Sequence, residues 1–183
     1  MAKGDLVFVD IETTGLDWDK HHAIEIAYQT QEMEKPEILI PWTYYGNRHR
    51  GYRNIWHNAD PVAMEINKFF ERYPDGVDFS GNNAIDRMIG TMTDSTLVGA
   101  NVRFDARFIE KFIGKEVWHH RLFDIQAYAA GYWQQTTLMG WSDICDTVRD
   151  EGLTFTAPDH TAAADCQSVK DVYNWLVLGR PPT

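Results

Sequence analysis

An apolar strand that ends in two acidic residues, LVFVDIETTG at residues 6–15, is the most informative stretch of this sequence. The side chains of residues 6–11 point alternately to the two faces of a β-strand. The segment Thr13-Thr14-Gly15 then turns the chain. Asp10 and Glu12 are two residues apart on this strand, so both side chains project from one face. Two neighbouring carboxylates repel each other, and a divalent cation between them would relieve the repulsion. Taken alone, the pair fits an ion site and two solvated acids at a strand end equally well.

Two more strands are predicted in the next 30 residues. Apolar and polar positions alternate from Ala23 to Thr30, and the apolar segment Glu37–Trp42 resembles a third strand. Pro41 lacks a backbone N–H, so it places the end of this third strand at a sheet edge. The short connections between these segments favour an antiparallel meander.

Beyond residue 60 the pattern changes to helices alternating with short strands. Asp60-Pro61 is a typical helix start, with Asp as the cap and Pro in the first turn, and apolar residues at helical spacing continue to Tyr73. The further elements that we expect are a helix over 82–92, a strand over 96–100, a helix through Asp105 that ends near Gly114, a strand over 116–119, a helix opened by 123–124 that runs toward 132, a helix capped by Ser142 that runs to about 151, and a last helix over 161–178. This order predicts an α/β fold in which a mixed sheet is flanked by helices.

The composition is that of an ordinary globular domain. The 183 residues are 44% hydrophobic and 24% charged, and no linker or repeat divides the sequence, so we expect one domain over residues 1–183. The net charge of −10 excludes a protein that coats nucleic acid through overall positive charge, although bound cations can supply positive charge locally. The N-terminal apolar run is too short and too acidic for a signal peptide or a membrane span. Cys145 and Cys166 are expected to be free thiols of a soluble cytoplasmic protein.

Asp105 is an acid in an unexpected position. Its helical neighbours three, four and seven residues further on are all Phe or Ile, so the carboxylate faces the apolar side of its helix. An unpaired charge is costly there. A buried ion pair with Arg103 or Arg107 is the structural alternative, but those side chains point to other faces of the helix. We therefore favour a functional carboxylate.

Asp165 repeats this pattern on the last predicted helix, whose inward side continues through Val169, Val172 and Leu176. His160 stands five residues earlier, at the helix entrance. A histidine near a helix start is usually a cap or a surface residue. Beside a carboxylate cluster, however, an imidazole that titrates near neutral pH can take a proton from water.

Three segments, VFVDIETTGL (7–16), LVGANVRFDARFI (97–109) and HTAAAD (160–165), resemble in order the three motifs of the DEDDh 3′–5′ exonucleases. This group of the ribonuclease H-like superfamily includes polymerase proofreading subunits and oligoribonucleases. The resemblance covers nearly the whole chain, and the His-x4-Asp spacing is similar to the histidine branch of the group. It implies a ribonuclease H-like mixed sheet, with three antiparallel strands followed by parallel ones.

The resemblance also implies a role for each acidic residue. Asp10 would bridge two divalent ions, Glu12 and Asp165 would complete the shell of one ion, and Asp105 would hold the second. His160 would be the general base for the attacking water. Oxygen ligands and a phosphate substrate favour Mg²⁺ or Mn²⁺ over zinc.

Substrate contacts are implied at three further positions. Thr13 and Leu16, in the turn after the first strand, would hold the terminal nucleotide, and Asn101 matches the asparagine that precedes the second-motif aspartate by four. The family usually has His before that asparagine, whereas this chain has Ala100. We expect this difference to alter substrate positioning rather than to abolish catalysis.

The segment over residues 42–57 combines three arginines with five aromatic residues and contains no acid. The arginines and aromatic residues are Arg48, Arg50, Arg53, Trp42, Tyr44, Tyr45, Tyr52 and Trp56. Such a mixture suits single-stranded nucleic acid, because bases stack on rings while arginines meet phosphates. Docking of a partner protein and packing of the rings on the third strand are the two alternatives.

Together these features predict a metal-dependent 3′–5′ exonuclease that releases nucleoside 5′-monophosphates, with 3′ ends of single-stranded DNA favoured over RNA. An RNA-directed exonuclease that uses the same site is the first alternative, and a non-catalytic docking module is the second. The negative charge favours distributive trimming unless a polymerase or another replication or repair partner tethers the chain. The sequence leaves the oligomeric state open.

Overall fold

A computed structural model describes residues 4–44 and 55–179 of the chain. Within these residues the sheet has five strands in the order β3-β2-β1-β4-β5. The strands are β1 (Leu6–Thr13), β2 (Ala23–Thr30), β3 (Glu37–Leu39), β4 (Thr96–Gly99) and β5 (Phe123–Asp124). The first three pair in antiparallel fashion, while β4 is parallel to β1 and β5 is parallel to β4. The predicted mixed α/β sheet is therefore confirmed.

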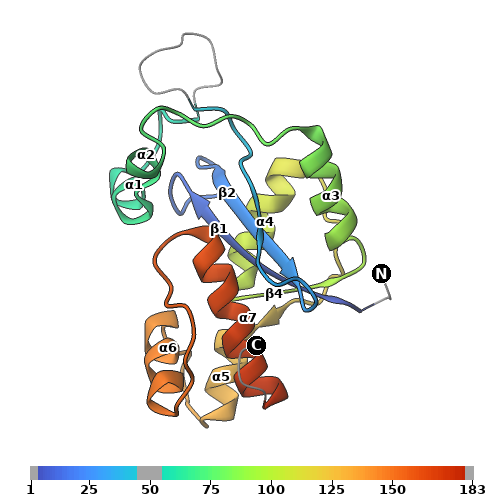
Figure 1. Cartoon of the computed structure of the whole chain (residues 1–183), viewed down its shortest axis with the longest axis vertical. Helices are drawn as coiled ribbons and strands as arrows, with labels where there is room; N and C mark the ends of the chain where they lie inside the picture. Colours follow the sequence, from blue (N-terminus) through green and yellow to red (C-terminus); the bar gives the residue numbers. More distant parts are fainter. Residues whose placement is uncertain (1–3, 45–54, 180–183) are drawn as a thin grey trace.

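Helices cover both faces of this sheet (Figure 1). They are α1 (Pro61–Asn67), α2 (Phe69–Arg72), α3 (Asn82–Met92), α4 (Val102–Ile113), α5 (Ile125–Tyr132), α6 (Trp141–Asp150) and α7 (Ala162–Leu178). Because side chains alternate along a strand, Val7 and Val9 of β1 pack with α3 and α4, whereas Phe8 packs with α5, α6 and α7. In the described part of the chain, none of the helices is long and apolar enough to cross a membrane.

A third, smaller core lies where α1 and α2 meet the start of β2. Ile24, Met64 and Phe69 are buried there, and Trp42, Tyr44 and Trp56 pack around them. The Trp56 ring lies 5.2 Å from the ring of Phe69, centroid to centroid. The described aromatic residues of the 42–57 segment therefore pack into the protein, while its three arginines, Tyr45 and Tyr52 lie outside the described residues.

Two predicted helices differ at their ends. The helix expected over 61–73 is interrupted at Lys68, whose backbone is left-handed with φ 50° and ψ 30°, so α1 ends and α2 begins there. The last helix before α7 was expected to be capped by Ser142, but Gly140 occupies the cap position and α6 begins at Trp141. Both differences are set by single backbone conformations that side-chain periodicity does not encode.

The third strand is shorter than predicted, since β3 ends at Leu39 rather than at Trp42. The next backbone N–H, that of Ile40, donates to the Ser80 hydroxyl at 2.7 Å instead of joining the sheet. Pro41, which follows, has no N–H to donate.

The segment over 116–119 was predicted to be a strand and is not one. Its peptide groups bond to the turn before β4 instead, where the Asp94 N–H donates to the Val117 carbonyl at 3.0 Å and the His119 N–H donates to the Ser95 carbonyl at 2.7 Å. The neighbour of β4 is Phe123–Asp124, which was predicted to open a helix and forms β5 before α5 starts.

Candidate active site

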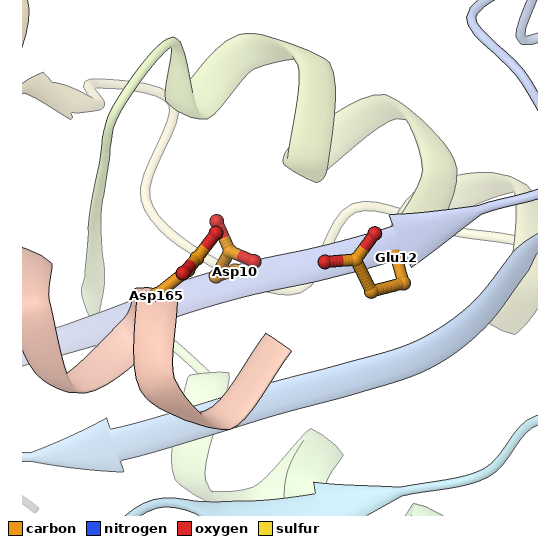
Figure 2. Close-up of side chains that lie close together, drawn as sticks. All are labelled: Asp10, Glu12 and Asp165. Atoms are coloured by element: carbon orange, nitrogen blue, oxygen red, sulfur yellow. The ribbon is translucent and has the colours of Figure 1, made fainter. Parts of the chain in front are cut away.

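Three carboxylates from two elements meet at the end of β1. Asp10 and Glu12 come from β1 and Asp165 from the first turn of α7, and each is partly exposed. One oxygen from each of the three side chains lies within 4.8 Å of the others. Figure 2 shows Asp10 and Asp165 facing each other, with Glu12 further along the strand. Asp165 follows Asp10 by about 155 residues in the sequence, and the two side chains meet because α7 packs across β1.

The charges of this cluster act on one another. Burial raises the pKa of Asp10 well above its usual value, and the negative charges of Asp105, Asp165 and Glu12 raise it further. Burial also raises the pKa of Glu12 to about 9, with Asp165 the next largest cause. The pKa of Asp165 is raised by burial as well, although the Asp159 N–H, which donates to its Oδ1 at 3.0 Å, opposes this. Groups that resist ionisation in this way would be stabilised as anions by a cation.

Asp105 lies next to this cluster but is more deeply buried, with 4% of its surface exposed. It stands on the first turn of α4, on the side that packs against β1. Its charge is the second largest cause of the raised pKa of Asp10. Burial raises the pKa of Asp105 itself to about 8, while hydrogen bonding from the backbone of Ile11 opposes the rise. Of the two arginines considered as structural partners, Arg107 lies instead over the ring of Trp18, and Arg103 is exposed.

His160 lines the same pocket as Asp10 and Asp165. It is exposed, and its backbone is left-handed with φ 61° in the loop that leads into α7. Thr161 then caps the helix by accepting from the Ala164 N–H. The imidazole is close enough to lower the pKa of Asp165.

The pocket that contains these groups measures about 230 Å³. Thr13 and Leu16, which the sequence singled out, form part of its wall. Another part of the lining comes from α1, through Ala63, Ile66 and Asn67, and none of these was predicted as a site residue. Ile66 belongs to the apolar stripe that predicted the helix, yet its side chain is half-exposed. Its place on that stripe was the signal in the sequence that could have pointed to it.

The turn after β1 is held by its own hydrogen bonds. The Thr13 hydroxyl donates to the Gly15 carbonyl at 2.9 Å, and the Asn67 side-chain amide donates to the Thr13 carbonyl at 3.1 Å. A side chain on Gly15 would begin 2.7 Å from the imidazole of His21, so only glycine fits there. This packing fixes Leu16, which is 77% exposed, at the rim of the pocket.

Asn101 lies outside the carboxylate pocket. It occupies the left-handed position before α4, with φ 58°, and lines an adjacent pocket together with Leu16, Arg103 and Phe104. Leu16 and Phe104 line both pockets, so the two are neighbours.

A partly buried ion pair lies beside the cluster on β2. Glu25, which is 2% exposed, accepts two hydrogen bonds from the Arg72 guanidinium, at 2.6 and 2.7 Å, and one from the Tyr73 hydroxyl at 2.7 Å. Glu25 lies directly opposite Glu12 in the sheet, and Arg72 lowers the pKa of Glu12. Sequence reasoning missed this pair because its partners are 47 residues apart.

Comparison with known proteins gives a fold but no family model. No model of a protein family matches the sequence. Among solved structures, the zinc-bound complex of E. coli exonuclease I with single-stranded DNA has a TM-score of 0.67 at 16% identity, over 98% of this chain and 41% of that one. The chain has the fold of exonuclease I.

Two further structures agree. The complex of E. coli exonuclease I with a dA16 oligonucleotide has a TM-score of 0.57 at 15% identity, over 96% of this chain and 42% of that one. The product-bound structure of exonuclease I has a TM-score of 0.56 at 17% identity, over 97% of this chain and 44% of that one. The chain thus spans about two fifths of the length of the exonuclease I chains that it matches.

Proposed function

We propose that this chain is a metal-dependent 3′–5′ exonuclease that hydrolyses phosphodiester bonds at 3′ ends of single-stranded nucleic acid and releases nucleoside 5′-monophosphates. The observation that carries the proposal is the convergence of Asp10, Glu12 and Asp165 within 4.8 Å, in a pocket that also contains His160. The exonuclease I fold around this pocket supports the same function, because structures of exonuclease I hold single-stranded DNA.

The residues present fit a hard divalent cation. All donors in the cluster are carboxylate oxygens, the ligands that Mg²⁺ and Mn²⁺ prefer. The raised pKa values of Asp10, Glu12 and Asp165 come from burial and mutual repulsion, both of which a cation would offset. We assign one ion to these three residues and a second ion to Asp10 and the adjacent Asp105.

The remaining chemistry falls to the residues that line the pocket. When bound, the ions would activate the attacking water and stabilise charge on the phosphate and on the leaving 3′-oxygen. His160, exposed at the pocket edge, would accept the proton of that water. The terminal base would contact the apolar part of the lining, to which the exposed side chains of Leu16 and Ile66 contribute.

DNA is the favoured substrate, since the matching structures contain deoxyoligonucleotides. RNA is the alternative that the same carboxylates and base would serve, because discrimination depends on contacts to the 2′-hydroxyl.

The test is the degradation of a 5′-labelled single-stranded DNA and of its RNA twin, with Mg²⁺, with Mn²⁺ and with EDTA. We expect a ladder that shortens from the 3′ end in either metal and is absent in EDTA, and the polymer that is cut faster identifies the substrate. Asp10→Ala should abolish the ladder. Asp86→Ala, which removes an exposed carboxylate on α3, should leave it intact.

Two results would contradict the proposal. Cleavage that persists in EDTA would exclude the metal site as the source of activity. A wild-type protein that binds no metal and cuts neither polymer would favour the docking-module alternative.

A further inference from the structure

An open track leads away from the carboxylate pocket along α4. The carboxylate pocket and its neighbour share Leu16 and Phe104, and that neighbour shares Trp18 and Arg107 with a third hollow further along the helix. The three hollows therefore adjoin one another in a row, which we call the path. A 3′ end held at the carboxylates would have this path available for the nucleotides that precede it.

Beyond the carboxylate pocket, the path is lined by positively charged side chains, although the chain has a net charge of −10. Arg103, Arg107 and Lys111 follow one another at intervals of four residues, so they form a single stripe on α4. Both arginines are exposed. Glu110 lines the far hollow, and Asp17 and Asp19 flank Trp18 in the sequence, where Asp17 pairs with Lys20. With Lys20 counted, the described cations of this region still outnumber these three acids.

Trp18 lies over this stripe, and both its backbone and its ring contact residues of α4. It is 45% exposed, and the guanidinium carbon of Arg107 lies 5.8 Å from its ring centroid. Its backbone is tied to α4 by Lys111, whose ammonium group donates to the carbonyls of Trp18 at 2.6 Å and of His21 at 2.8 Å. A ring that is already held in place loses little conformational entropy when a ligand stacks on it.

We propose that Trp18, Arg103 and Arg107 form a second nucleotide-binding site, the Trp18 site, which binds the nucleotides upstream of the 3′-terminal one in a single strand. The proposal rests on the proposed exonuclease function for the direction of the strand. Bases would stack on the indole while the two guanidinium groups contact phosphates. A single strand is required, because its bases are free to stack on a protein ring.

A packing role for Trp18 is the alternative. In that case the indole merely covers the outer surface of α4, and Arg107 stabilises the ring by a cation–π contact. The two interpretations differ in what the ring does to ligand affinity, so they can be separated by binding measurements.

The experiment measures equilibrium binding by fluorescence anisotropy, with end-labelled oligonucleotides of two and eight nucleotides as probes. DNA and RNA versions are compared, in EDTA and in Ca²⁺, so that binding is read without relying on cleavage. The proteins are the wild type, Trp18→Ala, Trp18→Phe and Arg107→Glu. The matched control is Arg121→Glu, which reverses an exposed arginine in the loop before β5.

We expect the wild type to bind the octanucleotide more tightly than the dinucleotide. Trp18→Ala should reduce this advantage by about tenfold, the scale of one lost base stack, and Trp18→Phe should retain most of it. In Arg107→Glu, the slope of log affinity against log salt concentration should become less steep by about 0.7, because one phosphate contact is lost. The reversed charge can make this change larger. Arg121→Glu should bind as the wild type does.

Two outcomes would overturn the Trp18 site. One is a wild type whose affinity does not increase with length, which includes a wild type that binds neither probe. The other is a length advantage that Trp18→Ala and Arg107→Glu leave unchanged. Length-dependent binding through Trp18 by a protein that cuts nothing would support the site and contradict the exonuclease function. Cleavage by the wild type, together with a length advantage that Trp18→Ala and Arg107→Glu leave unchanged, would support the exonuclease function and contradict the Trp18 site.

Discussion

Glu12 and Glu25 lie directly across from each other on β1 and β2, yet the groups around their carboxylates differ. Glu25 is paired with Arg72 and Tyr73 in the interior, whereas Glu12 joins Asp165 and has its pKa raised to about 9. One acid is therefore neutralised by the fold itself. The other has no such cation beside it in the described structure, which is what the proposed metal site requires of Glu12.

The pair between Glu25 and Arg72 should be important for stability. Arg72→Met would leave the Glu25 carboxylate buried without its cation, and we expect the free energy of unfolding to fall by about 3 to 5 kcal/mol. Urea denaturation followed by circular dichroism would measure this. Arg149→Met, which breaks the exposed pair with Asp146 at 2.8 Å, is the control and should cost less than about 1 kcal/mol. Equal losses for the two variants would show that the Glu25 pair has no special role.

The sequence predicted those parts of the site that depend on periodicity within one element. Asp10 and Glu12 share a strand face, and Asp105 faces the apolar side of its helix, because the repeats of strand and helix set these directions. Asp165 was placed by the same reasoning on α7. These are the residues that the three motifs also identified.

What the sequence could not supply is the choice of neighbour for each element. The wall formed by Ala63 and Ile66 depends on where α1 docks, and the pair of Glu25 with Arg72 joins segments that only the tertiary fold brings together. The interruption at Lys68 was missed for a related reason, because a left-handed residue leaves no trace in hydrophobic spacing. Long-range docking and single backbone conformations account for most of the differences.

Asp10→Asn should separate catalysis from folding. We expect activity to fall by about a thousandfold or more, as for loss of an essential catalytic group. In EDTA at pH 8, however, the variant should unfold at a higher urea concentration than the wild type. Burial and the neighbouring acids raise the pKa of Asp10, so its ionisable carboxyl opposes folding at this pH, and asparagine does not. A variant that is both inactive and less stable would indicate a structural role for Asp10. Asp86→Asn is the control for both measurements.

The metal-free protein should lose stability as the pH rises. Glu12 has a folded pKa of about 9 against an ordinary value of 4.5, so between these values the folded state holds more protons than the unfolded state. Each increase in pH across this window then favours unfolding. We expect the urea midpoint in EDTA to fall between about pH 5 and pH 9, and Glu12→Gln or added Mg²⁺ to reduce the fall. A midpoint in EDTA that rises through this window would contradict the expectation.

His160→Ala should slow the chemical step and leave metal binding in place. Loss of a general base lowers the rate by about 10²- to 10⁴-fold, so kcat should fall by this factor while the Mg²⁺ concentration needed for half-maximal activity stays nearly constant. His120→Ala, an exposed histidine in the loop before β5, is the control. A variant that loses metal affinity instead would place His160 among the ligands.

Degradation should be distributive at physiological salt. The net charge of −10 weakens the hold on a polyanion after each cut, and the described cations that we assign to the upstream strand are few. The measurement starts the reaction on a labelled strand and then adds a large excess of unlabelled strand. We expect shortening of the labelled strand to stop, with bands of intermediate length left behind, and to continue for longer at low salt, where dissociation is slower. If bound strands are instead degraded to the end in the presence of the competitor, the acidic surface does not limit the residence time of the substrate.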